Sequence, residues 1–128
     1  MKSFKELEVW QRVVNLATET YKLTDALPRA ERFGLTIQAR RAAASVAANI
    51  AEGWGRGSTR EYIQFLLIAR GSLMELETHL IIARQLNYVR PEALEQVQSQ
   101  IEIVGKMLNR LVIALRGRSG LKPPAPKP

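Results

Sequence analysis

Residues 45–77 read SVAANIAEGWGRGSTREYIQFLLIARGSLMELE, and this stretch contains the junction between two long helical patterns. It carries glycines and polar residues where an ordinary helical hairpin needs neither. Gly71 falls in a helix interior, where glycine costs about 1 kcal/mol relative to alanine. Glu52 falls near a helix end, where a carboxylate meets the negative pole of the helix dipole. We therefore expect a close backbone approach or another compensating gain at Gly71, and a cationic partner for Glu52.

Two local signals mark the ends of the helices on either side of this junction. Gly53 fits the left-handed position just past a helix end, which predicts a helix over residues 31–51. Ser58 followed by Glu61 is a capping box that satisfies free amide groups, and it predicts a helix over residues 59–86. The segment GWGRGS between them is interpreted as a glycine-rich connector. A nucleotide cradle is disfavoured because no strand precedes the segment and the lysine of a phosphate loop is absent.

In an antiparallel pair, residues equidistant from the middle of the connector, near Arg56, should lie level. Glu52 is then expected to pair with Arg60 or Arg56. The same alignment places Arg40 and Arg41 near Gly71 and Ser72, with Arg41 pairing with Glu75, and lets Asn49 bond to the helix over 59–86. The sequence thus predicts a polar seam made of Asn49, Glu52, Gly53, Gly71, Ser72 and Glu75.

Apolar residues spaced three and four apart predict two further helices. The first covers residues 4–26 and ends before Pro28, and the last follows Pro91. Their apolar faces are expected to be Leu7, Trp10, Val14, Ala17, Tyr21 and Thr24 in the first, and Leu94, Val97, Ile101, Val104, Leu108, Leu111 and Leu115 in the last. Four helices with short links predict an all-α fold, an antiparallel up-down-up-down four-helix bundle.

The bundle is expected to cover residues 1–115 as one domain, followed by a basic, Pro-rich, flexible tail over 116–128. The third and fourth helices carry more apolar residues than one buried stripe needs: Ile63, Leu67, Met74, Ile81, Ile103, Met107 and Ile113. Leaving them in water would expose large apolar patches, so we predict a homo-oligomer through these two helices. The alternative is a wide buried face within one chain.

Composition narrows the function classes. The 128 residues include no cysteine and one histidine, His79, so neither a disulfide framework nor a cysteine-ligated metal site can form. Glu75 and Glu77 point to different helix faces, as do Glu77 and His79, which gives no acid–base pair. The sequence predicts no enzyme, no cofactor and no metal. No run of 18 apolar residues is present, and a cytoplasmic protein without a membrane partner is expected.

The formal net charge of +7 is concentrated in the tail and in residues 29–70, where arginine predominates. Arginine suits bidentate contacts to phosphate, and an aromatic ring can stack on a base. The predicted nucleic-acid-binding residues are Arg40, Arg41, Trp54, Arg56, Arg60, Arg116, Arg118 and Lys122. The first functional hypothesis is an oligomeric RNA-binding bundle. The second is a protein-interaction scaffold with no nucleic-acid role, in which the arginines form intersubunit salt bridges.

Several motifs of the chain resemble one bacterial family. They are the string Asn49-Ile50-Ala51-Glu52-Gly53 with Arg56, then Phe65, Ala69, Gly71-Ser72 and Glu75-Leu76-Glu77, and, earlier, residues 4–11 and 31–35 with Gln38, Arg40, Arg41 and Ala42. Together they resemble the four-helix bundle proteins encoded in intervening sequences of large-subunit ribosomal RNA genes. The resemblance extends to Val89 and implies an antiparallel bundle that assembles into a five-membered ring with a central channel.

A related group, the accessory variability determinants of diversity-generating retroelements, is similar in fold and assembly to this family. Its members bind RNA together with a reverse transcriptase. For this chain the resemblance therefore implies RNA, and a reverse transcriptase or another protein, as candidate partners beside further copies of itself.

Overall fold

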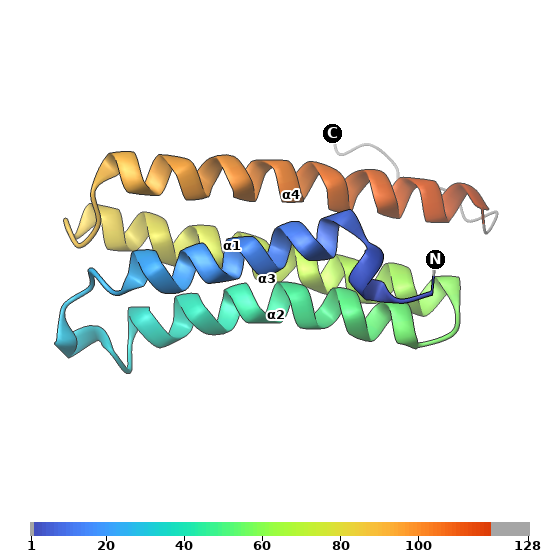
Figure 1. The fold of residues 1–128 in the computed structure, drawn as a ribbon, viewed down its shortest axis with the longest axis horizontal. Helices are drawn as coiled ribbons and strands as arrows, with labels where there is room; N and C mark the ends of the chain where they lie inside the picture. Colours follow the sequence, from blue (N-terminus) through green and yellow to red (C-terminus); the bar gives the residue numbers. More distant parts are fainter. Residues whose placement is uncertain (1, 119–128) are drawn as a thin grey trace, which may run out of the picture.

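The computed structural model describes residues 2–118, which form four long helices and no strand (Figure 1). Two single turns of 3₁₀ helix, η1 and η2, precede the first and second of these helices. The elements are η1 (Phe4–Glu6), α1 (Glu8–Thr24), η2 (Arg29–Glu31), α2 (Leu35–Gly55), α3 (Thr59–Gln85) and α4 (Pro91–Arg118). The predicted all-α class is confirmed.

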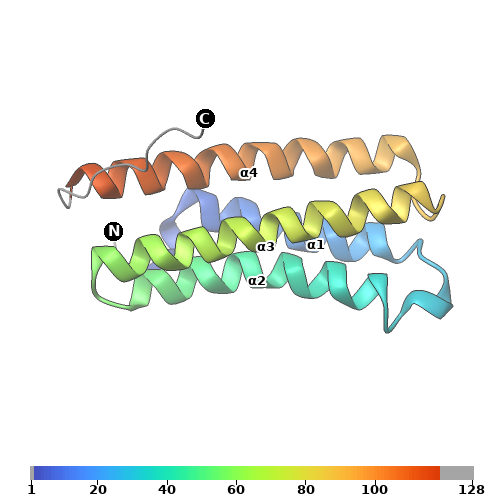
Figure 2. The same cartoon turned by 180° about the vertical axis from the view of Figure 1, so that it is seen from behind.

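Successive helices run in opposite directions, and each packs against two neighbours (Figures 1 and 2). α1 and α3 both contact α2 and α4, and the α2–α3 contact is the most extensive. The predicted up-down-up-down bundle is confirmed within the described residues. The start of the chain, the α2–α3 connection and the end of α4 gather at one end of the bundle, and the other two connections lie at the opposite end.

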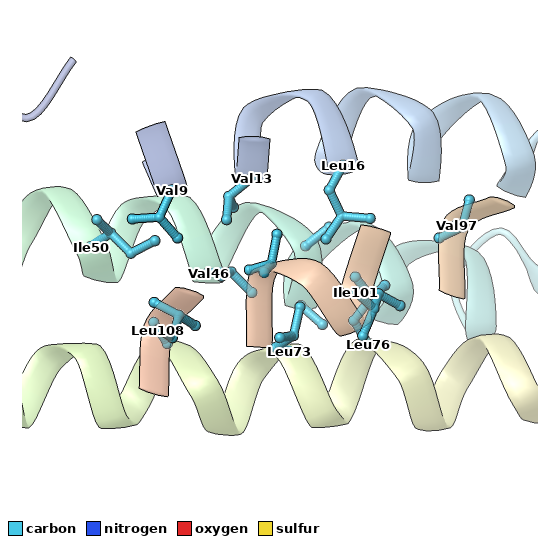
Figure 3. Close-up of a cluster of buried hydrophobic side chains, with 14 of the residues drawn as sticks. Val9, Val13, Leu16, Val46, Ile50, Leu73, Leu76, Val97, Ile101 and Leu108 are labelled. Atoms are coloured by element: carbon cyan, nitrogen blue, oxygen red, sulfur yellow. The ribbon is translucent and has the colours of Figure 1, made fainter. Parts of the chain in front are cut away.

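The core is a column of aliphatic side chains drawn from all four helices (Figure 3). Leu16, Ile50, Leu76 and Leu108 come one from each helix and are all fully buried. Small residues dominate the buried face of α2, where Ala39, Ala42 and Ala43 lie among the core residues. Small side chains let helix axes approach closely, which accounts for the extensive contact between α2 and α3.

Helix ends follow the sequence signals where side chains cap them. The Ser58 hydroxyl accepts a hydrogen bond from the Glu61 amide at 3.2 Å and donates to the Glu61 carboxylate at 3.1 Å, which confirms a cap at this position. α3 ends at Gln85, and two residues later Asn87 has a left-handed φ of 61°. The next amide, of Tyr88, donates to the Ala83 carbonyl. α4 then begins with Pro91, in the first helical turn, where proline is favoured.

The predicted end of the second helix is wrong. α2 continues to Gly55, so Gly53 lies inside the helix, and the left-handed glycine of the connection is Gly57, with φ of 86°. Gly53 is needed for packing: an added Cβ would lie 2.7 Å from the Phe65 Cβ and 3.2 Å from the Tyr62 carbonyl oxygen. Its lack of a side chain is what lets α2 and α3 approach each other here.

The predicted buried face of the first helix is right only at its two ends, where Leu7 and Thr24 are buried. The residues that α1 buries are Val9, Val13, Leu16, Thr20 and Thr24. The chain contains two overlapping stripes at helical spacing, and the one richer in aromatic residues lies to one side of the core. Val14 is 36% exposed and Tyr21 47% exposed. In α4 the prediction holds except that Val112 is buried where Leu111, only partly buried, was expected.

Most contacts of the predicted polar seam are wrong. Asn49 does not reach α3: its side-chain amide donates to the Ser45 carbonyl at 2.8 Å and to the Ser45 hydroxyl at 3.0 Å, both within α2. The link between the helices is a 2.9 Å hydrogen bond joining the hydroxyls of Ser45 and Ser72. Because α2 is longer than predicted, the level pairs are centred near Ser58 and not near Arg56.

The two carboxylates of the predicted seam are paired outside the core. Glu52 pairs with Arg56 at 3.6 Å, one of its two predicted partners, but both side chains are exposed. Glu75 lies 3.5 Å from His79 within α3, and no ion pair joins it to Arg41 in residues 2–118. In the register centred near Ser58, Arg41 and Glu75 lie at about the same level, but both are exposed and Glu75 approaches His79 instead. The seam is therefore reduced to the Asn49, Ser45 and Ser72 hydrogen bonds.

The expected close approach at Gly71 is not present. Gly71 is exposed, and no atom of the described residues lies within 4 Å of the place where a Cβ would stand. Nothing within one described chain therefore offsets the conformational cost of glycine at this position.

Replacing Gly71 with alanine should raise the free energy of unfolding by up to about 1 kcal/mol, since alanine is the better helix former and meets no clash. Urea denaturation at one fixed protein concentration measures this change. A loss of stability would contradict the expectation, because it would require an atom outside residues 2–118 of the same chain to pack against the glycine.

The boundary of the predicted tail shifts slightly. α4 extends to Arg118, so Arg116 and Arg118 belong to the last turn of a helix and not to an irregular tail. The remainder of the predicted tail, including Lys122, lies outside the described residues.

Candidate nucleic-acid interface

Arg40 is committed to contacts inside the bundle. Its guanidinium donates to the Thr24 hydroxyl at 2.9 Å, to the Tyr21 carbonyl at 3.3 Å and to the Asp25 carboxylate at 3.0 Å. It also lies 4.7 Å from the centre of the Tyr21 ring. These contacts join α2 to the end of α1, which gives Arg40 a structural role and leaves it few donors for another ligand.

Arg56 is likewise engaged at the α2–α3 connection. It pairs with Glu52 at 3.6 Å and with Glu61 at 3.5 Å, and its guanidinium lies 5.4 Å from the centre of the Phe65 ring. Two carboxylates offset its charge, so Arg56 serves first to hold the connection against both helices. Such exposed pairs contribute little stability and can rearrange when a competing anion binds.

Arg41 and Arg60 differ from these two arginines, because both are exposed and form no ion pair within residues 2–118. They lie at different places. Arg41 precedes Trp54 in α2 by about 20 Å along the helix axis, at 1.5 Å per residue. Arg60 lies in the first turn of α3, next to the connection. The structure does not bring the two together into one patch.

Trp54 and Tyr62 form an aromatic pair at the end of the bundle. Their ring centres lie 6.1 Å apart with the planes at 89°, an edge-to-face arrangement that covers at most one ring face. The Tyr62 hydroxyl oxygen is buried and has no hydrogen-bond partner among the described residues. Burial raises the pKa of Tyr62 above its ordinary value, so the hydroxyl stays protonated at neutral pH.

A small pocket of about 280 Å³ opens beside this pair, and we call it the aromatic pocket. The end of α2, the start of α3 and the end of α4 all contribute to its lining. The lining residues are Gly53, Trp54, Gly57, Ser58, Thr59, Tyr62, Leu115 and Arg118. The structure therefore brings Trp54 and Arg118 together, two of the predicted binding residues that lie far apart in the sequence.

We use the term loop-end surface for the aromatic pocket together with the exposed Arg60. Arg116 and Arg118 occupy the last turn of α4, where cations meet the negative pole of the helix dipole. Arg118 lines the pocket, and Arg116 is half-buried nearby in the same turn. Of the eight predicted binding residues, Arg40 and Arg41 lie away from this surface, and Lys122 lies outside the described residues.

Sequence reasoning missed Tyr62, Thr59 and Leu115 as members of this pocket. The capping box at Ser58 predicts Tyr62 in the first turn of α3. Had α2 been predicted to run to Gly55, Trp54 would have been expected at the same level as Tyr62. The misplaced end of α2 at Ala51 hid that relation. The contribution of Leu115 could not be read from local pattern, since it depends on how far α4 runs past the connection.

Three further observations concern the rest of the described residues. Residues 2–118 contain no group of three or more His, Asp or Glu side chains placed to hold a metal ion. His79 has no hydrogen-bond partner there beyond its 3.5 Å approach to Glu75. None of the helices in this range is both long and apolar enough to cross a membrane.

Comparisons with known proteins identify the fold and family. The family model described as 23S rRNA-intervening sequence protein matches residues 5–110. A solved structure of a protein of unknown function from the S23 ribosomal protein family, from Bacteroides thetaiotaomicron, is similar in fold, with a TM-score of 0.75 and 24% identity. The match covers 81% of this chain and 97% of that protein. No curated protein sequence matches the chain.

Proposed function

The chain belongs to the 23S rRNA-intervening sequence protein family, and from this premise we propose that it is a non-enzymatic, homo-oligomeric bundle that binds RNA through the loop-end surface. The observation that carries the proposal is the grouping of Trp54, Arg60 and Arg118 at one end of the bundle. Cations beside partly exposed aromatic rings suit a polyanion whose bases can be reached.

Charge supports the proposal over a purely structural reading of these arginines. The net charge is +7 per chain, and each further copy in an oligomer adds the same amount. Arg60 has no carboxylate partner among residues 2–118, so binding a phosphate costs it no existing ion pair. Arg56 would first have to leave Glu52 and Glu61, which makes it a weaker contributor than the sequence alone suggests.

Replacing Arg60 with glutamine should weaken binding of single-stranded RNA several-fold and reduce the slope of log K against log salt by about 0.7, the value for one lost phosphate contact. Fluorescence anisotropy across a salt series measures both quantities. Arg41→Gln is the matched control, since Arg41 is equally exposed and unpaired but lies elsewhere on α2. An equal loss in both variants would show that the loop-end surface is not the preferred site.

Self-association is proposed to use the outer faces of α3 and α4. A groove of about 620 Å³ runs between these helices, with Leu73, Met74 and Ile101 among the residues that line it. Met74 is 60% exposed, and Ile81 and Ile113 are also exposed on the same two helices. A second copy would cover this apolar surface. The five-membered ring is proposed from the family resemblance alone.

Light scattering coupled to size-exclusion chromatography should give the mass of two or more chains of 14.4 kDa each. Met74→Lys should shift the population toward the single chain, because it places a charge in the covered surface. Phe33→Lys is the control: Phe33 is 82% exposed but lies outside α3 and α4. A wild-type mass of one chain would contradict self-association.

The alternative function, a protein-interaction scaffold, is favoured by the same groove, which Glu77, Glu95 and Glu102 make acidic along its rim. An acidic, partly apolar groove fits a basic protein segment better than RNA. Absence of RNA binding at low salt, in a protein that still self-associates, would favour this second function.

A further inference from the structure

We propose that the aromatic pocket takes one unpaired nucleobase of a single-stranded RNA, stacked on Trp54. This inference rests on the proposed RNA-binding function and adds to it the part of the RNA that is recognised. It assigns the pocket to bases and leaves the phosphates to the surrounding arginines.

The size of the pocket favours a single base. Its volume of about 280 Å³ is just below the range of about 300–1,000 Å³ in which pockets hold drug-sized ligands. A complete nucleotide would extend beyond it, whereas one planar ring system would fit with the sugar and phosphate outside. Trp54 and Tyr62 meet edge to face, so their contact leaves ring surface on which a base can stack.

Tyr62 lines the pocket, but its hydroxyl oxygen is buried and closed to solvent. A buried polar atom without a hydrogen-bond partner is unfavourable and is rare in native proteins. The hydroxyl oxygen of Tyr62 is such an atom among the described residues. The hydroxyl could donate to a base, or accept from one, only after the Tyr62 side chain moved, so the proposed recognition rests on stacking against Trp54.

The start of α3 is not the site of a phosphate. A free helix N-terminus would attract an anion, but here the Ser58 hydroxyl accepts from the Glu61 amide and the Glu61 carboxylate lies 3.1 Å from that hydroxyl. The carboxylate would repel a phosphate at this point. Arg118 on the pocket wall and the exposed Arg60 are the cations placed to contact the backbone on either side of an inserted base.

The test compares two probes of equal length, a short oligouridylate and the same ribose-phosphate chain without bases. The wild-type chain should bind the oligouridylate about 5- to 140-fold more tightly, which is the worth of one stacked base. Trp54→Ala should lose this preference, whereas Trp54→Phe should keep most of it.

Equal binding of both probes by the wild-type chain would overturn the inference while leaving RNA binding by charge intact. Binding of neither probe would reject the proposed function itself. If Trp54→Ala fails to fold, the comparison of the two probes on the wild-type chain and on Trp54→Phe still decides the question. The control variant Trp10→Phe changes the other tryptophan, which packs edge to face on Phe4, and should leave the base preference unchanged.

Discussion

Replacing Gly53 with alanine should destabilise the bundle by about 2 kcal/mol, within the range of about 1–3 kcal/mol seen when a packed core is overfilled. The new Cβ would lie 2.7 Å from the Phe65 Cβ and 3.2 Å from the Tyr62 carbonyl oxygen. Neither atom is the far end of a flexible side chain, so α2 and α3 must separate. The gain of about 1 kcal/mol in helix propensity offsets only part of that cost.

Gly55→Ala is the matched control for this substitution. Gly55 lies in the same helix, one position past Trp54, and, apart from the adjacent backbone, no atom of residues 2–118 lies within 4 Å of its added Cβ. Because alanine has the higher helix propensity and meets no clash here, Gly55→Ala should be neutral or slightly stabilising. Urea denaturation of both variants at one protein concentration measures the difference, expected to be about 2–3 kcal/mol. Equal stabilities for the two variants would show that the α2–α3 approach is not limited by Gly53.

The glycines of the junction explain what local pattern could and could not predict. A glycine at a helix end and a glycine at a close helix contact look the same in a sequence, since both only require a missing side chain. Gly53 was interpreted as the first kind and is the second, while Gly57 takes the left-handed position. The capping box at Ser58 was predictable because its whole mechanism lies within four residues.

The consequences of that one boundary extend to the candidate site. Ending α2 early centred the predicted pairs near Arg56, so Ser45 was not aligned with Ser72 and their hydrogen bond was missed. The composition of the loop-end surface was foreseen in part, because Trp54 and the arginines stand out as residue types. Its geometry was not, since the pocket needs the end of α4 to reach the α2–α3 connection.

Two adjacent valines test the corrected face of α1. Val13 is fully buried among the core residues of Figure 3, and Val14, which the sequence pattern placed in the core, is 36% exposed. Val13→Ala should cost about 2–3 kcal/mol, from the loss of buried methyl groups at about 0.8 kcal/mol each plus a cavity. Val14→Ala should lie within about 0.5 kcal/mol of the wild type.

The comparison is well matched because both variants remove the same atoms from neighbouring positions of one helix. The gain in helix propensity from valine to alanine is common to both, so the difference between them reports burial alone. Denaturant unfolding at fixed concentration supplies the two values. A larger loss for Val14→Ala would restore the stripe of Trp10, Val14 and Tyr21 as the buried face. It would also require α1 to be rotated relative to α2 and α4, which would break the Arg40 contacts to Tyr21 and Thr24 that hold it in place.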